Sequence, residues 1–246
     1  MESFWLASPH GLTTNAGLNR ATWDLRHDAP PAFAHGFEFN GNPGTTPMAP
    51  EGPLALPGVY TVRLTVDGTH YTQTMTVRAD PRSHVPAAAV AAQHELVMRL
   101  YSGLEATWAA FRPVAELRDA VTKLAAGDTA SELGKATQTL RAELDSIAGD
   151  SSAEAREIWQ PQPTAWSLTD LNGEFALDLN LQDNADYAPT QATLALVRAN
   201  CDELRKLVDR WDKVVRQNLV TVNRLLTSRG VATLATPSRS EKLCAP

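Results

Sequence analysis

Hydrophobic residues recur along the chain with two different periods. Before about residue 80 the period is two, and after it the period is that of a helix. Apolar and polar side chains alternate through Val59–Val66 and again through Thr69–Val77, with Asp67-Gly68 between the two runs. Such alternation indicates strands with one buried face, and Asp-Gly is a strong signal for a tight hairpin turn. We therefore predict a β-hairpin. Because an isolated hairpin is marginal in water, we expect it to belong to a larger sheet.

The residues that precede the hairpin contribute one further strand signal. Gly17–Leu25 alternates in a way that predicts a strand with Trp23 buried. The stretch 28–57 is rich in proline and glycine, so we predict a loop or irregular excursion. Its aromatic residues Phe33, Phe37 and Phe39 are expected to pin part of the loop to the sheet.

After Asp80-Pro81-Arg82, apolar residues recur every three or four positions, which predicts amphipathic helices. The expected helices are about Pro86–Arg112, kinked or restarted at Pro113 and continuing to Ala126; Thr129 or Ser131 to Gly149; Ser167–Leu181; and Thr190–Arg229.

The last of these helices is expected to be a rod on the order of 55–60 Å long. Its seam follows the a/d spacing of a helix that packs along another helix. We interpret the seam as the core of an intramolecular bundle rather than as an assembly surface, because the chain supplies its own partner helices. The seam positions are Val197, Cys201, Leu204, Val208, Trp211, Val215, Asn218, Val222 and Leu225.

Composition narrows the function classes. The 246 residues carry a net charge of −6 with a pI near 5.5, which argues against a nucleic-acid surface. The sequence holds no apolar run long enough to span a membrane, and Met1–Leu12 lacks the pattern of a signal peptide. One disulfide between Cys201 and Cys244 is possible, but we interpret Cys201 as a core residue of its helix and Cys244 as an unpaired thiol in the tail.

No catalytic motif or paired metal-ligand spacing occurs, so we predict no catalytic residue, metal site or cofactor. Asp170, Glu174 and Asp178 lie four residues apart on one helix face, where two carboxylates would suit glycosidase chemistry. A solvated acidic face is the interpretation we favour. Trp159 and Trp166 lie beside prolines and are candidates for contact with a sugar or a protein partner. These five residues are the binding candidates.

Several motifs together resemble the C-terminal portion of bacterial secreted sortilin-like or BNR-repeat "glycosyl hydrolase" proteins. In that family a β-propeller is followed by an immunoglobulin (Ig)-like module and a helical tail. The β part is also similar to the Ig-like domain of flagellar hook-capping proteins, through Asn19, Trp23, Asp24, Gly58, Tyr60 and Leu64. The motifs are GLNRATWDLRHD at 17–28, PGVYTVRLTVDGTHYTQTMTVRADPR at 57–82, LNGEFALDLNLQDNADYAPTQATLALV at 171–197, Trp211 and NLVTVNRLL at 218–226.

The resemblance implies an α+β fold and a secreted or periplasmic location. Residues 1–82 would form an Ig-like β-sandwich, which is either complete or lacks strands. Residues 83–236 would form an antiparallel bundle of about four long helices, and residues 237–246 would form a flexible tail. This sequence contains neither the propeller nor a signal peptide, so we expect a fragment or a free-standing descendant of the tail. The family's hydrolase label belongs to the propeller and transfers to no residue here.

These observations favour a non-catalytic module that mediates docking or assembly in an extracytoplasmic bacterial protein. The expected partners are another protein, the parent propeller or further copies of the chain, with no nucleic acid and no membrane span. The alternative is a carbohydrate-active protein, either a glycoside hydrolase or a carbohydrate-binding module.

Overall fold

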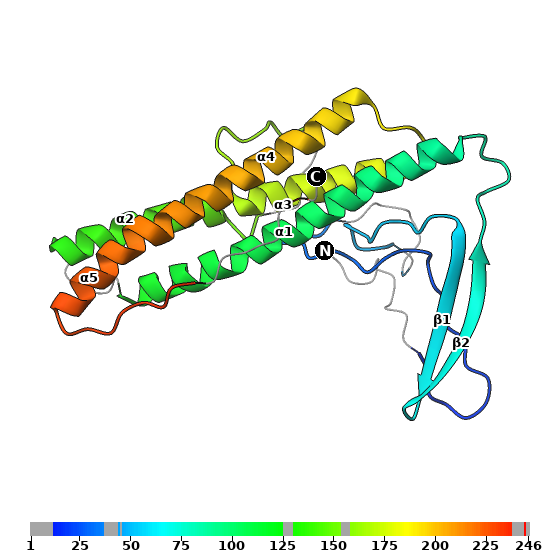
Figure 1. Ribbon diagram of the computed structural model, residues 1–246, viewed down its shortest axis with the longest axis horizontal. Coiled ribbons are helices and arrows are strands. Elements are labelled where there is room, and N and C mark those ends of the chain that lie inside the picture. Colours follow the sequence, from blue (N-terminus) through cyan, green and yellow to red (C-terminus); the bar gives the residue numbers. More distant parts are fainter. Residues whose placement is uncertain are drawn as a thin grey trace.

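The computed structural model describes residues 12–36, 44, 46–124, 130–153, 158–237 and 244. Figure 1 shows a long helical bundle with a β-hairpin that projects from one end of it. In chain order, the elements are β1 (Gly58–Val66), β2 (Thr69–Val77), α1 (Ala87–Leu124), α2 (Glu132–Ala148), α3 (Leu168–Gln182), α4 (Gln191–Val214), η2 (Val215–Leu219) and α5 (Val220–Ser228).

The predicted hairpin is confirmed. β1 and β2 pair antiparallel in a register that runs from Gly58 opposite Val77 to Val66 opposite Thr69. Asp67 and Gly68 both have positive φ angles, 47° and 77°. Two central residues in the left-handed region match the twist of the flanking strands, which is why Asp-Gly suits this turn.

The expected Ig-like β-sandwich is wrong. Within the described part of the chain the sheet has two strands, β1 and β2. Gly17–Leu25 forms no strand, and Trp23 is 42% exposed rather than buried. The amide of Asn19 donates to the carbonyls of Asn15 and Gly17, and Leu25 has a φ of 64°. The Asn19 side chain therefore occupies two backbone carbonyls that a strand would use for pairing, and the left-handed backbone of Leu25 interrupts the extended run.

The proline- and glycine-rich stretch is irregular, as predicted, with isolated bridges Arg26–Leu54 and Gly36–Ala49. Phe33 does not pin it to the sheet. Its ring packs instead against Trp108 at 4.8 Å and Phe111 at 4.5 Å between ring centroids, both on α1. Phe37 and Phe39 lie outside the described residues.

The helices after residue 82 are confirmed, with two corrections. Pro113 lies inside one continuous helix, α1, and does not restart it. Val114, Leu117 and Val121 stay buried on the far side of the proline, so packing of the same face offsets the lost backbone bond. Among the described elements, α1 and the continuous rod α4–η2–α5 are long, whereas α2 and α3 have 17 and 15 residues and follow one another along them (Figure 1).

The helix ends follow the capping residues that the sequence offers. Ser131 accepts from the backbone of Gly134 at the start of α2, and Gly149, with a φ of 79°, follows its last residue. Ser167 and Asp170 form a capping box at the start of α3, and Thr190 caps α4. Each cap satisfies backbone groups that the helix itself leaves unpaired.

The core of the bundle contains most of the predicted seam. Val197, Leu204, Trp211 and Val222 are buried, Trp211 to 4% exposure. Val215 and Asn218 are only half-buried, whereas Leu219 is 1% exposed. The cause is the wider turn of the π-helical segment η2, which brings Leu219 rather than Asn218 into the core; the predicted seam resumes at Val222 and Leu225.

Candidate docking surface

The strand register sorts the side chains of the hairpin onto two faces of different character. One face is polar apart from Val59 and holds Thr61, Arg63, Thr65, His70, Thr72, Thr74 and Thr76. The other, which we call the apolar hairpin face, holds Tyr60, Val62, Leu64, Val66, Tyr71, Gln73, Met75 and Val77, with Gly58 and Thr69 at its ends.

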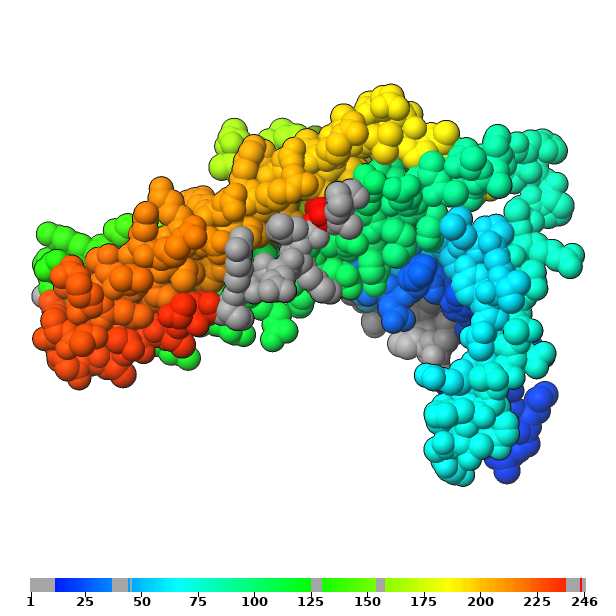
Figure 2. Space-filling view, viewed as in Figure 1, coloured from blue at the N-terminus to red at the C-terminus, as the bar shows by residue number. Residues whose placement is uncertain are grey.

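The apolar hairpin face is bare towards the turn. Val62, Leu64, Val66 and Tyr71 are 50%, 48%, 47% and 58% exposed. Figure 2 shows the hairpin as an arm that stands clear of the bundle. Within the described residues no third strand pairs with either edge of the sheet. The arm therefore presents both a clustered apolar surface and two free strand edges, features that mark interaction sites.

The root of the same face is covered by the N-terminal segment. The ring of Trp23 meets that of Tyr60 edge-on, with 5.3 Å between centroids. The Tyr60 hydroxyl donates to the Leu56 carbonyl at 2.5 Å, and Met75 and Val77 are half-buried. The exposed apolar area is therefore confined to the half of the hairpin nearest the Asp67-Gly68 turn.

A polar cluster fixes the segment behind the root to the bundle. Arg26 pairs with Asp183 at the end of α3 at 2.5 Å and with Glu51 at 3.4 Å. Asp183 also accepts from the backbone N–H of Leu54 at 3.1 Å. The side chain of Arg26 is 20% exposed and that of Asp183 15%, so this pair is shielded from water.

His94 on α1 faces the same segment. Its ring lies 6.1 Å from that of His27, centroid to centroid. Burial lowers the pKa of His94, and the proximity of His27 lowers it further, while the Leu54 backbone and Asp183 act in the opposite direction. The neutral imidazole is therefore favoured at this contact.

Asn172 on α3 provides a second anchor. Its side-chain oxygen accepts from the N–H of Phe33 at 3.1 Å, and its amide nitrogen donates to the Pro31 carbonyl at 3.2 Å. The same nitrogen donates to the hydroxyl of Thr107 on α1 at 2.9 Å. One buried amide thus joins α1, α3 and the loop, and this support holds the hairpin at a defined place on the bundle.

The three predicted site carboxylates all lie on α3, and each has its own contact. Asp170 accepts from the hydroxyl and backbone N–H of Ser167 in the capping box. Glu174 is 3% exposed and accepts from Gln162 at 2.8 Å. Asp178 is 6% exposed and accepts from the amide of Asn200 at 3.1 Å. The favoured interpretation of a solvated acidic face is therefore wrong for Glu174 and Asp178, which are buried. The contacts favour structural roles, and a binding role for the three carboxylates stays a prediction.

The two predicted site tryptophans differ in environment. Trp159 is 76% exposed, beside Ile158 at 65%. Trp166 is half-buried and packs against the hydrophobic core. The structure places Trp166 in the bundle and leaves Trp159 as the aromatic side chain of this pair that is open to a ligand.

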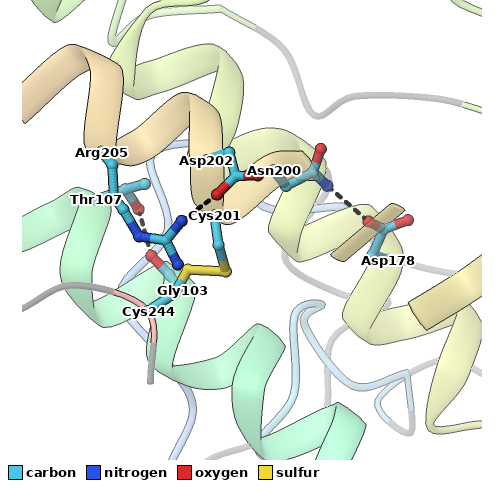
Figure 3. Close-up of a disulfide and its surroundings, with 8 residues drawn as sticks. All are labelled: Gly103, Thr107, Asp178, Asn200, Cys201, Asp202, Arg205 and Cys244. Carbon is cyan, nitrogen blue, oxygen red and sulfur yellow. Dashed lines mark hydrogen bonds and ion pairs between the residues drawn. A yellow bond between two sulfur atoms is a disulfide. The ribbon is translucent and has the colours of Figure 1, made fainter. Parts of the chain in front are cut away.

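The interpretation of the cysteines as unpaired is wrong. Cys201 on α4 forms a disulfide with Cys244, whose Cα lies 5.6 Å away, and Figure 3 shows the bond in its surroundings. Both cysteines are buried, at 6% and 5% exposure. Their separation of 43 residues gave no sequence signal beyond an even cysteine count.

Other important polar residues carried no pattern either. Gln93 on α1 donates to the carbonyls of Gln182 and Ala185, and its oxygen accepts from the N–H of Tyr187. Asn172 and Asn200 likewise lie within helical sequence that periodicity alone treats as surface or seam. Only their tertiary neighbours identify them.

The described residues contain no group of three or more side chains suited to hold a metal ion. None of the helices in the described ranges combines the length and the hydropathy needed to cross a bilayer. No protein-family model, curated protein or solved structure matches this chain.

Proposed function

We propose that this chain is a non-catalytic docking module of an extracytoplasmic bacterial protein. The helical bundle is the rigid support, and the apolar hairpin face is the docking surface. The observation that carries the proposal is the exposure of Val62, Leu64, Val66 and Tyr71 on a two-stranded arm anchored at its root. A hairpin of two strands is marginal in water, so a partner that covers this face would stabilise it.

The disulfide supports the extracytoplasmic part of the proposal. Disulfides persist in oxidising compartments and are rare where glutathione and thioredoxin keep thiols reduced. The bond between Cys201 and Cys244 joins a helix of the core to the tail, so it acts as a structural crosslink. A module that works outside the cytoplasm would form and retain it.

A photo-crosslinking amino acid at position 64 tests the docking surface directly. We expect Leu64→benzoylphenylalanine to form adducts in the producing organism, identified by mass spectrometry, because this side chain lies in the exposed half of the face. The matched control is the same replacement at Arg198, an exposed position on α4. Failure of position 64 to attach any protein, the chain itself included, would contradict the proposal.

Carbohydrate binding is the second candidate, and the exposure of Trp159 favours it. An exposed indole ring is a suitable surface for stacking on a sugar. Titration with a panel of glycans, followed by tryptophan fluorescence, should then show binding that Trp159→Ala abolishes and Trp166→Phe retains. Binding that survives Trp159→Ala removes this assignment.

If the protein is instead a glycoside hydrolase, its turnover of glycans should depend on Asp178. Turnover that survives Asp178→Asn would show that Asp178 is not a catalytic residue.

A further inference from the structure

We propose that the apolar hairpin face docks on the same face of a second copy of this chain. Two hairpins would pack face to face across a two-fold axis and form a four-stranded, two-layer sandwich between copies. This inference rests on the proposed docking function and names its partner. Three properties of the hairpin carry it: its charge, its symmetry and the place where its apolar surface is bare.

The lack of charged side chains on the apolar hairpin face makes the arm suitable for contact between two copies of this acidic chain. The apolar hairpin face has no carboxylate, lysine, arginine or histidine. In the hairpin as a whole, Arg63 on the polar face and Asp67 in the turn balance one another. The complete chain carries −6, so contact between bundles would bring like charges together. Contact through the arms buries neutral surface and keeps the acidic bundles apart.

The geometry of the face suits self-association. A two-fold interface brings a patch against itself, so the patch must fit its own image. Val62, Leu64 and Val66 line β1 at every second position, and Tyr71 lies opposite Leu64 on β2. Sheets that pack face to face lie about 10 Å apart, with side chains interdigitated. Because Trp23 covers the root, the axis would pass through the exposed half, near Leu64.

The size of the face predicts a weak, reversible dimer. The exposed half of the two nine-residue strands presents on the order of 150 Å² per copy, from a length of about 15 Å and a width of about 10 Å. A standard stable interface buries about 800 Å² per partner. We therefore expect a weak monomer–dimer equilibrium, with a dissociation constant on the order of hundreds of micromolar, strengthened by salt because salt screens repulsion between the acidic bundles.

Sedimentation equilibrium of the full chain tests the inference. We expect concentration-dependent dimers up to about 200 µM, with tighter association at about 300 mM than at about 20 mM NaCl. Val59→Thr, on the polar face, should leave the equilibrium unchanged. A wild-type chain that stays monomeric throughout this range, or whose dimer weakens with added salt, overturns the inference.

A charge-swap pair separates loss of docking from loss of folding. Leu64→Lys and Leu64→Asp should each weaken self-association at least tenfold, because like charges meet near the axis. A mixture of the two variants should recover a dimer, which a misfolded hairpin would not do. Dimers that ignore both substitutions, or variants whose mixture remains monomeric, overturn the face-to-face arrangement.

The crosslinking experiment distinguishes this inference from the proposed function. Adducts at position 64 between two copies of the chain support both. Adducts that contain only a different protein overturn the second-copy inference and leave the docking function standing. The absence of every adduct overturns both.

Discussion

At Gly103 the absence of a side chain determines how α1 meets α3. A Cβ atom there would lie 2.7–2.8 Å from three ring atoms of Phe175, which is fully buried. The glycine is helical and its backbone is unstrained, so its value lies in the space that it leaves for the ring. Glycine in a helix costs about 1 kcal/mol relative to alanine, and the closer packing of the Phe175 ring against α1 offsets this cost.

Gly103→Ala should therefore destabilise the protein although it improves helix propensity. We expect a net loss of about 1–3 kcal/mol in the free energy of unfolding, because the ring and the new methyl group overlap in a packed core. Urea denaturation measures it. In the double variant with Phe175→Leu the losses should be less than additive, since the smaller side chain removes the overlap. Strict additivity would contradict this account.

His94 gives the contact between the N-terminal segment and α1 a pH dependence. Because burial lowers its pKa in the folded state, the unfolded chain binds the proton more tightly. Stability from this group is present above the ordinary histidine value of 6.5 and is lost as the pH falls below it. The groups that face the ring are His27, Asp183 and the Leu54 backbone.

His94→Gln should reduce the loss of stability between about pH 7.5 and pH 5.5. Urea denaturation at both values, compared with wild type, isolates the contribution of this residue from that of the carboxylates. His84→Gln is the matched control because His84 is exposed. The account is wrong if His94→Gln loses as much stability on acidification as wild type does.

Among the elements, the rod α4–η2–α5 contains a π-helical turn, η2, and still buries seam residues on both sides of that turn. Leu204, Val208 and Trp211 are buried before η2, and Val222 and Leu226 are buried after it. A π-helical turn accommodates one residue more than an α-helical turn. The seam therefore continues past η2 to Val222 and Leu225, although Val215 and Asn218 are only half-buried.

Deletion of a residue tests this account of η2. Removal of the exposed Gln217 should convert η2 to regular α-helix and keep both halves of the seam in place, at a cost of about 1–2 kcal/mol. Removal of the exposed Asp209 on α4 should rotate one half by about 100° and unfold the bundle. Thermal denaturation followed by circular dichroism distinguishes them, and equal losses would refute the assignment.

On the scale of the whole molecule, the chain folds back along its own bundle. After α5 ends, Leu234 donates its N–H to the side-chain oxygen of Asn223 and accepts from its amide nitrogen, at 2.8 and 2.9 Å. Cys244, in the predicted flexible tail, is joined to Cys201 on α4. Cys244 is therefore crosslinked to α4 within the core of the bundle (Figure 3).

Reduction of this disulfide should destabilise the whole bundle. A crosslink over a separation of 43 residues removes freedom from the unfolded chain, and disulfides of this kind contribute about 2–4 kcal/mol. Chemical denaturation with and without reductant measures the difference. The variant Cys201→Ala/Cys244→Ala should match the reduced protein and ignore the reductant. A wild-type midpoint that does not move with reductant would contradict the crosslink.

The hairpin and the positions of the helices were predictable because their signals are local. Alternation and Asp-Gly determine a hairpin, and Ser131, Ser167 and Thr190 begin helices by satisfying the first backbone N–H groups. The candidate surface was predictable only in part. The sequence placed Val62, Leu64 and Val66 on one face, but it also led us to expect that further strands would cover that face.

What the sequence by itself determined is the rhythm of each element, the turn of the hairpin and most of the buried seam from Val197 to Leu225. The tertiary structure decided that Gly17–Leu25 is no strand, that Asn172 and Gln93 are anchors, and that Cys201 meets Cys244. The physical reason is the distance along the chain over which each interaction acts. Periodicity and capping act within a few residues, whereas strand addition, buried hydrogen bonds and disulfides depend on which distant segments come together.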